Sequence, residues 1–393
     1  MVARVYKRIA LGALLVYALY LAGGIALAAA GVISKVYFFP GWALKAPSHD
    51  ASTFAADGPI VRYHAGAALS TAIVPRGPRL VIQTDTLTTP AQSTVRCYVS
   101  ATRTAFDVAL HPQHTIEPSE YPAPAKMLVV SDIEGNFKGL DLLLRRAGVM
   151  DPAYRWRFGT GHLVVIGDVF DRGVQVTECL WLLYKLEQEA AQAGGKVHFI
   201  LGNHEFMNLT GHYKYVRRKY RHNADSLRID YATWYGPETE LGRWLRTKNV
   251  AEKIGSTLFV HGGISPAVVA FRPSLAYLNE QARKRLDTAP SNSSGLAKVL
   301  ADPKVSPDWY RGLALQEASA THVERVMTQY GVQRIVVGHT PVSEITPLYE
   351  GKVVAIDMPH QMNTDEQGLM KALWIENGRF FAIRTDTSKR EEL

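Results

Sequence analysis

Hydrophobic positions fall into three patterns along the chain. Residues 9–34 contain no charged side chain, a run that is long enough to span a bilayer and longer than a typical signal-peptide core. Residues 58–110 contain short apolar stretches separated by Gly-Pro turns at 58–59 and 77–78, a pattern that predicts strands. From Lys126 onward, strand-like apolar runs alternate with helical periodicity, which is typical of an α/β domain.

These patterns divide the chain into five predicted segments. The segments are a cytoplasmic n-region at 1–8, a transmembrane anchor or signal peptide at 9–34, a juxtamembrane linker at 35–57, a small β module with a proline-rich linker at 58–125, and a large α/β domain at 126–393. The strands expected in the β module are Ile60–Tyr63, Leu69–Val74, Leu80–Thr84, Val95–Val99 and Phe106–Leu110.

The ends of the apolar segment favour one orientation in a membrane. Arg4, Lys7 and Arg8 precede it, and aromatic residues follow it, beginning at Tyr37. Basic residues before the span favour a cytoplasmic N-terminus, so the rest of the chain is expected outside the cytoplasm, in the periplasm of a Gram-negative cell. The alternative is a signal peptide cleaved near the small residues 28–31, which would leave a secreted or periplasmic protein.

Charge and cysteine content argue against a nucleic-acid partner and against a disulfide framework. The net charge is +8, but Arg4, Lys7, Arg8 and Lys35 supply four of these charges within the first 35 residues. The remaining excess is small, so we expect no nucleic-acid partner. The two cysteines, Cys97 and Cys179, are too few for a disulfide framework, although one bridge between them remains open.

Five apolar runs are each followed at once by residues that commonly bind metals. The runs and the blocks that follow them are Met127–Val130 with Ser131–Asn136, Leu163–Ile166 with Gly167–Gly173, His198–Leu201 with Gly202–Glu205, Thr257–Val260 with His261–Gly263, and Ile335–Val337 with Gly338–Thr340. Ligand sites in α/β sheets lie outside the carboxyl ends of the strands, so a shared sheet would bring the five blocks to one edge.

The residue types in these blocks indicate a particular kind of metal site. They offer oxygen and imidazole ligands without thiolate, a set that suits Mn, Fe or Zn rather than a structural zinc. Two metals roughly 3.5–4 Å apart could hold a bridging hydroxide and clamp an in-line displacement at phosphorus. Each block alone is also explained as a helix cap or a turn. Five blocks at comparable strand positions favour a single dinuclear site.

The blocks resemble those of the calcineurin-like metallophosphoesterases. Gly167–Gly173, Gly202–Glu205 and His261–Gly263 look most like the phosphoprotein phosphatase branch, and within it like the bacterial Shewanella-like phosphatases, some of which act on phosphotyrosine. The resemblance covers roughly residues 126–380. It implies a mixed α/β (α+β) fold with a central β-sandwich flanked by helices, preceded here by the small N-terminal β module and one transmembrane helix.

The resemblance also implies a role for each matching residue. Asp132 would bind the first metal, Asp168 would bridge both, and the second would be bound by Asn203, His261 and His339. His204 would be the general acid that protonates the leaving oxygen, and Asp171 would orient its ring. Arg172 would bind the phosphate, and Arg311 is a candidate for a second phosphate arginine, with a packed surface arginine as the alternative.

The first block departs from the family pattern at Glu134. The family usually has Asp-x-His there, whereas this chain has Asp132-Ile133-Glu134. A third carboxylate ligand would make the site less positive and would favour a harder ion such as Mn²⁺ over Zn²⁺. The alternative is that Glu134 turns away from the metal.

Two further features lie near these blocks without an assigned role. Residues 211–222 are rich in Tyr, Arg, Lys and His, which predicts either a solvated basic helix face or a surface for an acidic phosphopeptide. Asp357 and His360 follow a strand at 353–356 and could approach the site.

We therefore expect a dinuclear metal-dependent phosphomonoesterase, with a phosphorylated protein or a small phosphoester as substrate. Its reaction would be in-line attack by a metal-bridging hydroxide. The alternatives are a hydrolase of nucleotides such as dinucleoside polyphosphates, and a non-catalytic membrane-anchored binding module. The intact ligand set argues against the last, and the sequence predicts no oligomeric state.

Overall fold

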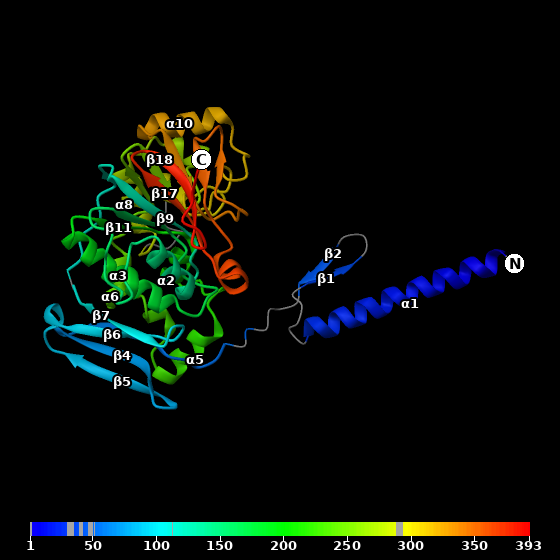
Figure 1. Ribbon diagram of the computed structural model, residues 1–393, viewed down its shortest axis with the longest axis horizontal. Helices are drawn as coiled ribbons and strands as arrows, with labels where there is room; N and C mark the ends of the chain where they lie inside the picture. The colour runs from blue at the N-terminus through cyan, green and yellow to red at the C-terminus, as the bar shows by residue number, and fades with distance from the viewer. Residues whose placement is uncertain are drawn as a thin grey trace. The chain divides into compact units, whose positions relative to one another are not determined.

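The computed structural model describes residues 2–29, 35–38, 42–45, 50, 52–111, 113–287 and 294–393. The chain forms two compact units, Met1–Ser52 and Thr53–Leu393 (Figure 1). The larger unit holds all five blocks, so the fold of that unit positions the candidate site.

The smaller unit begins with helix α1, Val2–Ala29. Within it, Tyr6–Leu27 has a mean hydropathy of 2.1 and is long and apolar enough to cross a membrane, a property that signal sequences share. Strands β1 (Lys35–Phe38) and β2 (Trp42–Lys45) then pair as an antiparallel hairpin. The segment expected as a linker therefore contains regular structure, because Val36, Tyr37 and Phe38 pair along their backbones with the strand that ends at Lys45.

The larger unit is a β-sandwich of two six-stranded sheets, which confirms the expected architecture. The strand orders are β11-β10-β9-β17-β18-β19 and β15-β16-β14-β13-β12-β8. The strands of the first sheet are β9 (Lys126–Val130), β10 (His162–Ile166), β11 (Lys196–Ile200), β17 (Lys371–Glu376), β18 (Arg379–Arg384) and β19 (Arg390–Glu392). Those of the second are β8 (Glu120–Tyr121), β12 (Ala251–Ile254), β13 (Thr257–Val260), β14 (Arg334–Val337), β15 (Thr346–Leu348) and β16 (Val353–Ala355).

The central strands are buried on both faces, which explains their uninterrupted apolar sequences. In β9, Met127 and Val129 face a core between the two sheets, while Leu128 and Val130 face the core under the helices. Strands β9, β10 and β11 are parallel, as are β13 and β14, so their carboxyl ends point the same way within each sheet. The loops after these strands are consequently neighbours.

Helices cover the sandwich; α4 begins inside a site block and α2 begins directly after one. The helices are α2 (Phe137–Arg146), α3 (Val176–Gln192), α4 (Asn203–Leu209), α5 (Arg218–Leu227), α6 (Glu240–Leu245), α7 (Pro266–Val269), α8 (Leu275–Lys284), α9 (Gly295–Leu300), α10 (Ala320–Tyr330) and α11 (His360–Met362). Helix α2 starts where Asn136 accepts a hydrogen bond from Gly139 N at 2.9 Å. Helix α3 packs against β11, α2 and α6.

The β module forms a three-stranded sheet and a separate hairpin, at the opposite end of this unit from α10 (Figure 1). The strands are β3 (Asp57–His64), β4 (Ala67–Arg76), β5 (Arg79–Leu87), β6 (Thr94–Val99) and β7 (Thr104–Ala109). They match the five expected strands and pack on α3 and α6. Cys97 and Cys179 are both buried free thiols, so no bridge joins them.

Candidate dinuclear metal site

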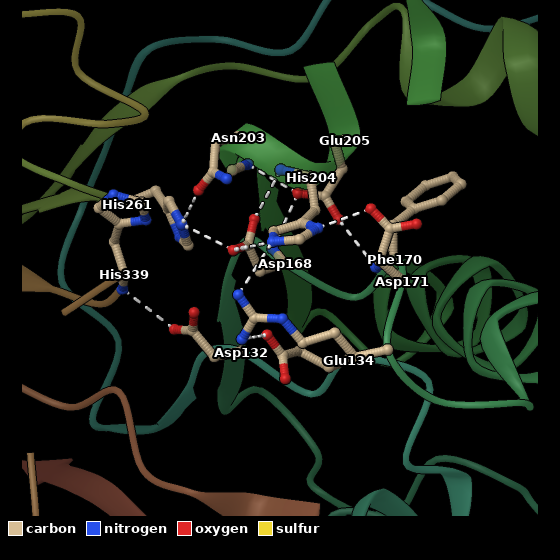
Figure 2. Close-up of polar contacts among 12 residues, drawn as sticks. Asp132, Glu134, Asp168, Phe170, Asp171, Asn203, His204, Glu205, His261 and His339 are labelled. Carbon is tan, nitrogen blue, oxygen red and sulfur yellow. Dashed lines mark hydrogen bonds and ion pairs between the residues drawn. The ribbon is translucent and has the colours of Figure 1, made fainter. Parts of the chain in front are cut away.

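The five blocks meet where the two sheets end (Figure 2). Asp132, Asp168 and Asn203 follow strands β9, β10 and β11 of the first sheet. His261 and His339 follow β13 and β14 of the second. All five side chains are buried, with residue exposures from 0% to 5%. Residues more than 200 positions apart along the chain thus share one polar cluster beneath the surface.

The loops of the site have strained backbones. Six non-glycine residues have positive φ: Asp132 at 54°, Glu134 at 49°, Asp168 at 55°, Asp171 at 70°, Arg172 at 55° and His339 at 62°. For such residues the left-handed region costs about 1–2 kcal/mol each. Strain of this kind persists where surrounding contacts hold it and is concentrated at functional sites. Here each turn directs a polar side chain toward the common centre.

Asn203, Asp168 and the two histidines form one half of the site. His261 Nδ1 donates to the carbonyl oxygen of Ile166 at 2.6 Å, which leaves Nε2 with a free lone pair. That Nε2 lies 3.2 Å from Asp168 Oδ2 and 3.0 Å from Asn203 Oδ1. Ligand atoms of Asp168, His261 and His339 all lie within 4.8 Å of one another.

The donor set of this half fits a cation. Asn203 Oδ1 lies 3.2 Å from Asp168 Oδ2 and 2.8 Å from His339 Nδ1, so acceptor atoms face one another. Turning the amide over would give ordinary hydrogen bonds, but the oxygen is the atom that binds a metal. Burial lowers the pKa of His261, but Asp168 and Asp132 outweigh this and raise it to about 10. The buried carboxylates thus create a strong demand for positive charge.

The other half of the site is rich in carboxylates. Burial raises the pKa of Asp132 to about 6, with Asp168 contributing and His261 opposing. Burial also raises the pKa of Glu134 to about 9, against the effect of Arg172 and with that of Asp132. Glu134, Asp168 and His204 offer ligand atoms within 4.8 Å of one another. These oxygen donors suit a second, hard cation.

Glu134 contacts both the carboxylate cluster and a neighbouring arginine. Its side chain lies at the edge of the carboxylate cluster and forms an ion pair with Arg172. Arg172 is thus held between Glu134 and His204, whose Nε2 lies 3.4 Å from Arg172 Nη2. The residue that departs from the family pattern therefore also contacts the expected phosphate-binding arginine.

His204 has the surroundings that a proton donor needs. Its Nδ1 donates to Asp171 Oδ2 at 2.6 Å, which fixes the ring and leaves Nε2 facing Asp168 at 3.8 Å. Asn208 Nδ2 donates to the same Asp171 oxygen at 3.0 Å. Burial lowers the pKa of His204, but Asp168 and the Asp171 hydrogen bond outweigh it and raise the pKa. These carboxylates therefore favour the charged imidazole more than water does.

Arg311 approaches the site from the loop between α9 and α10. Its Nη1 donates to the carbonyl oxygen of His339 at 2.7 Å and contacts Thr340 Oγ1 at 3.3 Å. The guanidinium therefore supports the strained turn at His339. This contact brings Arg311 beside the metal-ligand turn that follows β14 of the second sheet.

Three further buried residues, Glu205, Asn208 and Asp357, lie at the site but are not among the site residues predicted from the sequence. Glu205 accepts hydrogen bonds from the backbone N–H groups of Asp168, Val169, Phe170 and Gly202 at 2.8–3.4 Å (Figure 2). It therefore fixes the loop that carries the central aspartate, and its spacing from Gly202, as in a capping box, was the available signal. Asn208 is one helical turn after His204, a spacing that predicts a shared face.

Asp357 is the third, and it lies beside the carboxylates. Burial raises its pKa to about 9, with further contributions from Asp132 and Glu134. His360 is also buried, but its two ring nitrogens have no hydrogen-bond partner among the residues that the structure describes. In the sequence, only the position of Asp357 after the strand at 353–356 indicated that this residue approaches the site.

Comparison with known proteins agrees with this geometry. The calcineurin-like phosphoesterase family matches residues 125–343. An uncharacterized protein of Schizosaccharomyces pombe is 34% identical over 248 residues, which cover 60% of this chain and 73% of that protein. The Shewanella-like protein phosphatase 2 of Arabidopsis thaliana is 25% identical over 280 residues, 58% of this chain and 69% of that protein.

A solved structure is similar over nearly the whole larger unit. The cold-active protein-tyrosine phosphatase of a psychrophilic Shewanella species aligns with a TM-score of 0.76 and 31% identity. The alignment covers 86% of this chain and 99% of that one. The β module is included in this likeness, because 86% coverage exceeds the length of residues 125–393 alone.

Proposed function

Because the chain belongs to the calcineurin-like phosphoesterase family, we propose that it is a metal-dependent phosphomonoesterase that acts on phosphoproteins. The observation that carries this proposal is the contact between His204 and Arg172 beside the buried ligand cluster. A proton donor and a phosphate-binding cation 3.4 Å apart match the two needs of a phosphomonoester, which are protonation of the leaving oxygen and neutralisation of phosphate charge.

The proposed metal ligands follow from the two halves of the cluster. Asp168, Asn203, His261 and His339 would hold one divalent ion, and Asp132, Asp168 and Glu134 the other. When bound, the ions would activate water as the nucleophile and withdraw charge from the phosphoryl oxygens. The excess of carboxylates over imidazoles in the second half favours Mn²⁺, with Fe or Zn as alternatives.

The side chains of the protein would perform the remaining steps. Arg172 would bind non-bridging oxygens of the phosphate through its planar fork, and the half-exposed position of its side chain leaves it open to substrate. His204 would give the proton on Nε2 to the leaving oxygen, because Asp171 holds the proton on Nδ1. Arg311 would assist from the loop between α9 and α10, where it is hydrogen-bonded to the His339 turn.

A protein substrate is proposed from similarity. The relatives in Arabidopsis thaliana and Shewanella are a protein phosphatase and a protein-tyrosine phosphatase, respectively. The basic, tyrosine-rich segment at 211–222 adjoins the site through Arg217, whose Nη1 donates to the carbonyl oxygen of Arg172 at 2.8 Å. This segment supports recognition of a phosphorylated chain rather than of inorganic phosphate alone.

The test is hydrolysis by the full-length chain in detergent. With Mn²⁺ we expect turnover of phosphotyrosine and phosphoserine peptides and of p-nitrophenyl phosphate. Diadenosine tetraphosphate should be a poor substrate, and chelation of the metal should stop every reaction. Metal content is measured on the same samples. An inactive protein with two ions bound would exclude the enzymatic proposal, whereas preference for the dinucleotide would replace the protein substrate.

We also propose that α1 anchors the enzyme in a membrane with the larger unit outside the cytoplasm. The support is the apolar stretch Tyr6–Leu27 and the basic residues Lys7 and Arg8 at its N-terminal end. Protease added to intact spheroplasts should digest the larger unit, and peptides from residues 1–8 should persist in the mature protein. Protection of that unit would reverse the orientation, and absence of those peptides would indicate a cleaved signal.

A further inference from the structure

The tyrosine-rich segment after α4 places one ring beside the proton donor. The centroid of the Tyr215 ring lies 5.2 Å from that of His204, and the planes are tilted by 51°. The Arg172 guanidinium lies over the same ring, with Cζ 5.6 Å from the centroid. Tyr215 is only partly buried. Tyr215 neither binds metal nor carries a transferred proton. Its ring nevertheless borders His204 and Arg172, the two groups that would contact the phosphoester.

Backbone contacts hold this arrangement in place. Arg172 N donates to the carbonyl oxygen of Tyr215 at 3.2 Å, and Arg217 Nη1 donates to that of Arg172 at 2.8 Å. Val216, the next residue, is 8% exposed and packs in the main core. The position of the Tyr215 ring is therefore set by the fold of the segment as well as by its own side-chain contacts.

The geometry limits where the leaving group can lie. The bridging oxygen must reach His204 Nε2, and the phosphate must reach Arg172, whose Nη2 is 3.4 Å from that nitrogen. The carbon skeleton then extends away from both groups, along the ring that borders them. A phenol carries its ring directly on the bridging oxygen, so that ring would come close to Tyr215. A serine ester carries only one methylene there, which offers little surface to an aromatic ring.

We propose that Tyr215 is a specificity-determining residue that favours aryl phosphates, and phosphotyrosine in particular, over alkyl phosphates. This inference rests on the phosphomonoesterase activity proposed above. Water attacks phosphorus, the bond from phosphorus to the phenolic oxygen breaks, and the proton of His204 ends on that oxygen as the tyrosine hydroxyl. Tyr215 takes no part in these bond changes, and its contact with the leaving ring stabilises the bound aryl ester.

The size of the effect follows from the strength of aromatic contacts. A favourable pair of aromatic rings changes an equilibrium roughly 3- to 10-fold beyond simple burial. Because the contact is present in both the bound substrate and the transition state, it should appear mainly in KM and leave kcat almost unchanged.

The experiment compares two peptides that differ only in phosphotyrosine or phosphoserine, assayed with the full-length chain and Mn²⁺. In Tyr215→Ala we expect the kcat/KM ratio of phosphotyrosine to phosphoserine to fall about 3- to 10-fold, through a higher KM for phosphotyrosine. Tyr215→Phe should keep the ratio. Tyr215→Leu keeps bulk but removes the aromatic face, so its ratio should also fall. Tyr277→Ala, an exposed tyrosine on α8, is the matched control and should behave as wild type.

Each outcome separates this inference from its premise. A parallel loss on both peptides in Tyr215→Ala and Tyr215→Leu would mean that the ring only positions Arg172, and would overturn the specificity role. An unchanged ratio in both variants would overturn it as well. Failure of the wild type to hydrolyse either peptide would instead reject the proposed function. If Tyr215→Ala does not fold, the comparison of Tyr215→Leu with Tyr215→Phe decides.

Discussion

Two clusters of buried carboxylates lie in the larger unit, and only one of them has the features of a reaction centre. The first is the ligand cluster around Asp168. The second lies under the β module, where Asp57 of β3 and Glu178 of α3 flank Lys219 of α5. Lys219 Nζ is 3.4 Å from Asp57 Oδ2 and 3.9 Å from Glu178 Oε1, and all three residues are buried.

The two clusters differ in the source of their positive charge. Lys219 supplies it to the second cluster from within the chain, and its Nζ also donates to the carbonyl oxygen of Val174 at 2.6 Å. At the ligand cluster, Arg172 reaches only the outer edge through Glu134, and its side chain is 52% exposed. The inner donors face one another, a costly arrangement that a bound cation would relieve.

The backbone differs in the same sense. Asp57 belongs to a strand and Glu178 to the first turn of a helix, so regular hydrogen bonding holds both. Asp132, Asp168 and His339 all have positive φ. A buried charge in regular structure that is paired within the chain indicates a structural role in the packing of two modules. A buried charge on a strained turn, aimed at other donors, indicates binding and chemistry.

The largest expected effect is the loss of activity in Asp168→Asn. Loss of the central carboxylate should lower kcat by about 10⁴-fold, because both proposed ions lose a shared ligand. Bound metal, measured by elemental analysis, should fall. Asp107→Asn, a surface residue paired with Arg96, is the control. Full activity in Asp168→Asn would remove the bridging assignment.

The reverse pattern is expected for Lys219→Met. The substitution leaves Asp57 and Glu178 buried without their cation, which should lower the free energy of unfolding by about 3–4 kcal/mol. Bound metal per folded molecule and kcat at low temperature should be unchanged. Urea denaturation measures the free energy of unfolding, and elemental analysis measures the bound metal. Lys284→Met, which removes an exposed i,i+4 pair with Glu280, should cost no more than about 0.5 kcal/mol. Equal losses of unfolding free energy in Lys219→Met and Lys284→Met would contradict the distinction between the two clusters.

The sequence predicted the ligand cluster better than the second cluster, for a physical reason. Each ligand follows an apolar strand, and the carboxyl ends of parallel strands meet, so local pattern implies global proximity. The five strands of the β module could be predicted too. The packing of the β module on the helices could not be predicted. Its buried residues Asp57, Glu178 and Lys219 lie in three ordinary elements, and only tertiary packing brings these elements together. The same holds for the approach of Tyr215 to His204 and for the Glu134 ion pair with Arg172.

The assignment of roles within the ligand cluster stays a prediction from resemblance. The structure brings Asp132, Glu134, Asp168, Asn203, His261 and His339 together, but proximity does not separate ligand from neighbour. Asp357 illustrates the difficulty, because its carboxyl group lies in the same electrostatic environment without a matching family motif.

A smaller effect is expected for Asp171→Asn. The amide can no longer hold the proton of His204 Nδ1 as an anion does, so the supply of charged imidazole falls. We expect kcat on a phosphoserine peptide to drop about 100-fold. The drop on p-nitrophenyl phosphate should be much smaller, because that leaving group needs little protonation. Comparable losses on both substrates would show that Asp171 supports the fold of the site rather than proton transfer.

The smallest effect concerns the pH dependence of stability at the second cluster. Burial raises the pKa of Glu178 to about 8, with Asp57 adding to this and Lys219 opposing it, against 4.5 for the ordinary group. Because the folded pKa is raised, its contribution to stability is fully present below pH 4.5 and is lost as pH rises through about 8. Glu178→Gln keeps the neutral shape and cannot ionise. Between pH 5 and pH 9 the variant should therefore gain stability relative to wild type, measured by urea denaturation.

The prediction for Glu178→Gln sharpens the comparison between the two clusters. Like Asp168→Asn, it replaces a buried carboxylate with an amide, but the expected effects of the two substitutions differ. Removing a carboxylate charge from the second cluster should stabilise the fold at high pH and leave metal binding untouched, whereas Asp168→Asn should lower metal binding. Glu280→Gln, an exposed surface change, should show no gain between pH 5 and pH 9. A gain of equal size in that control would attribute the effect to net charge. A loss of stability in Glu178→Gln at high pH would mean that the charged carboxylate is the form that Lys219 requires.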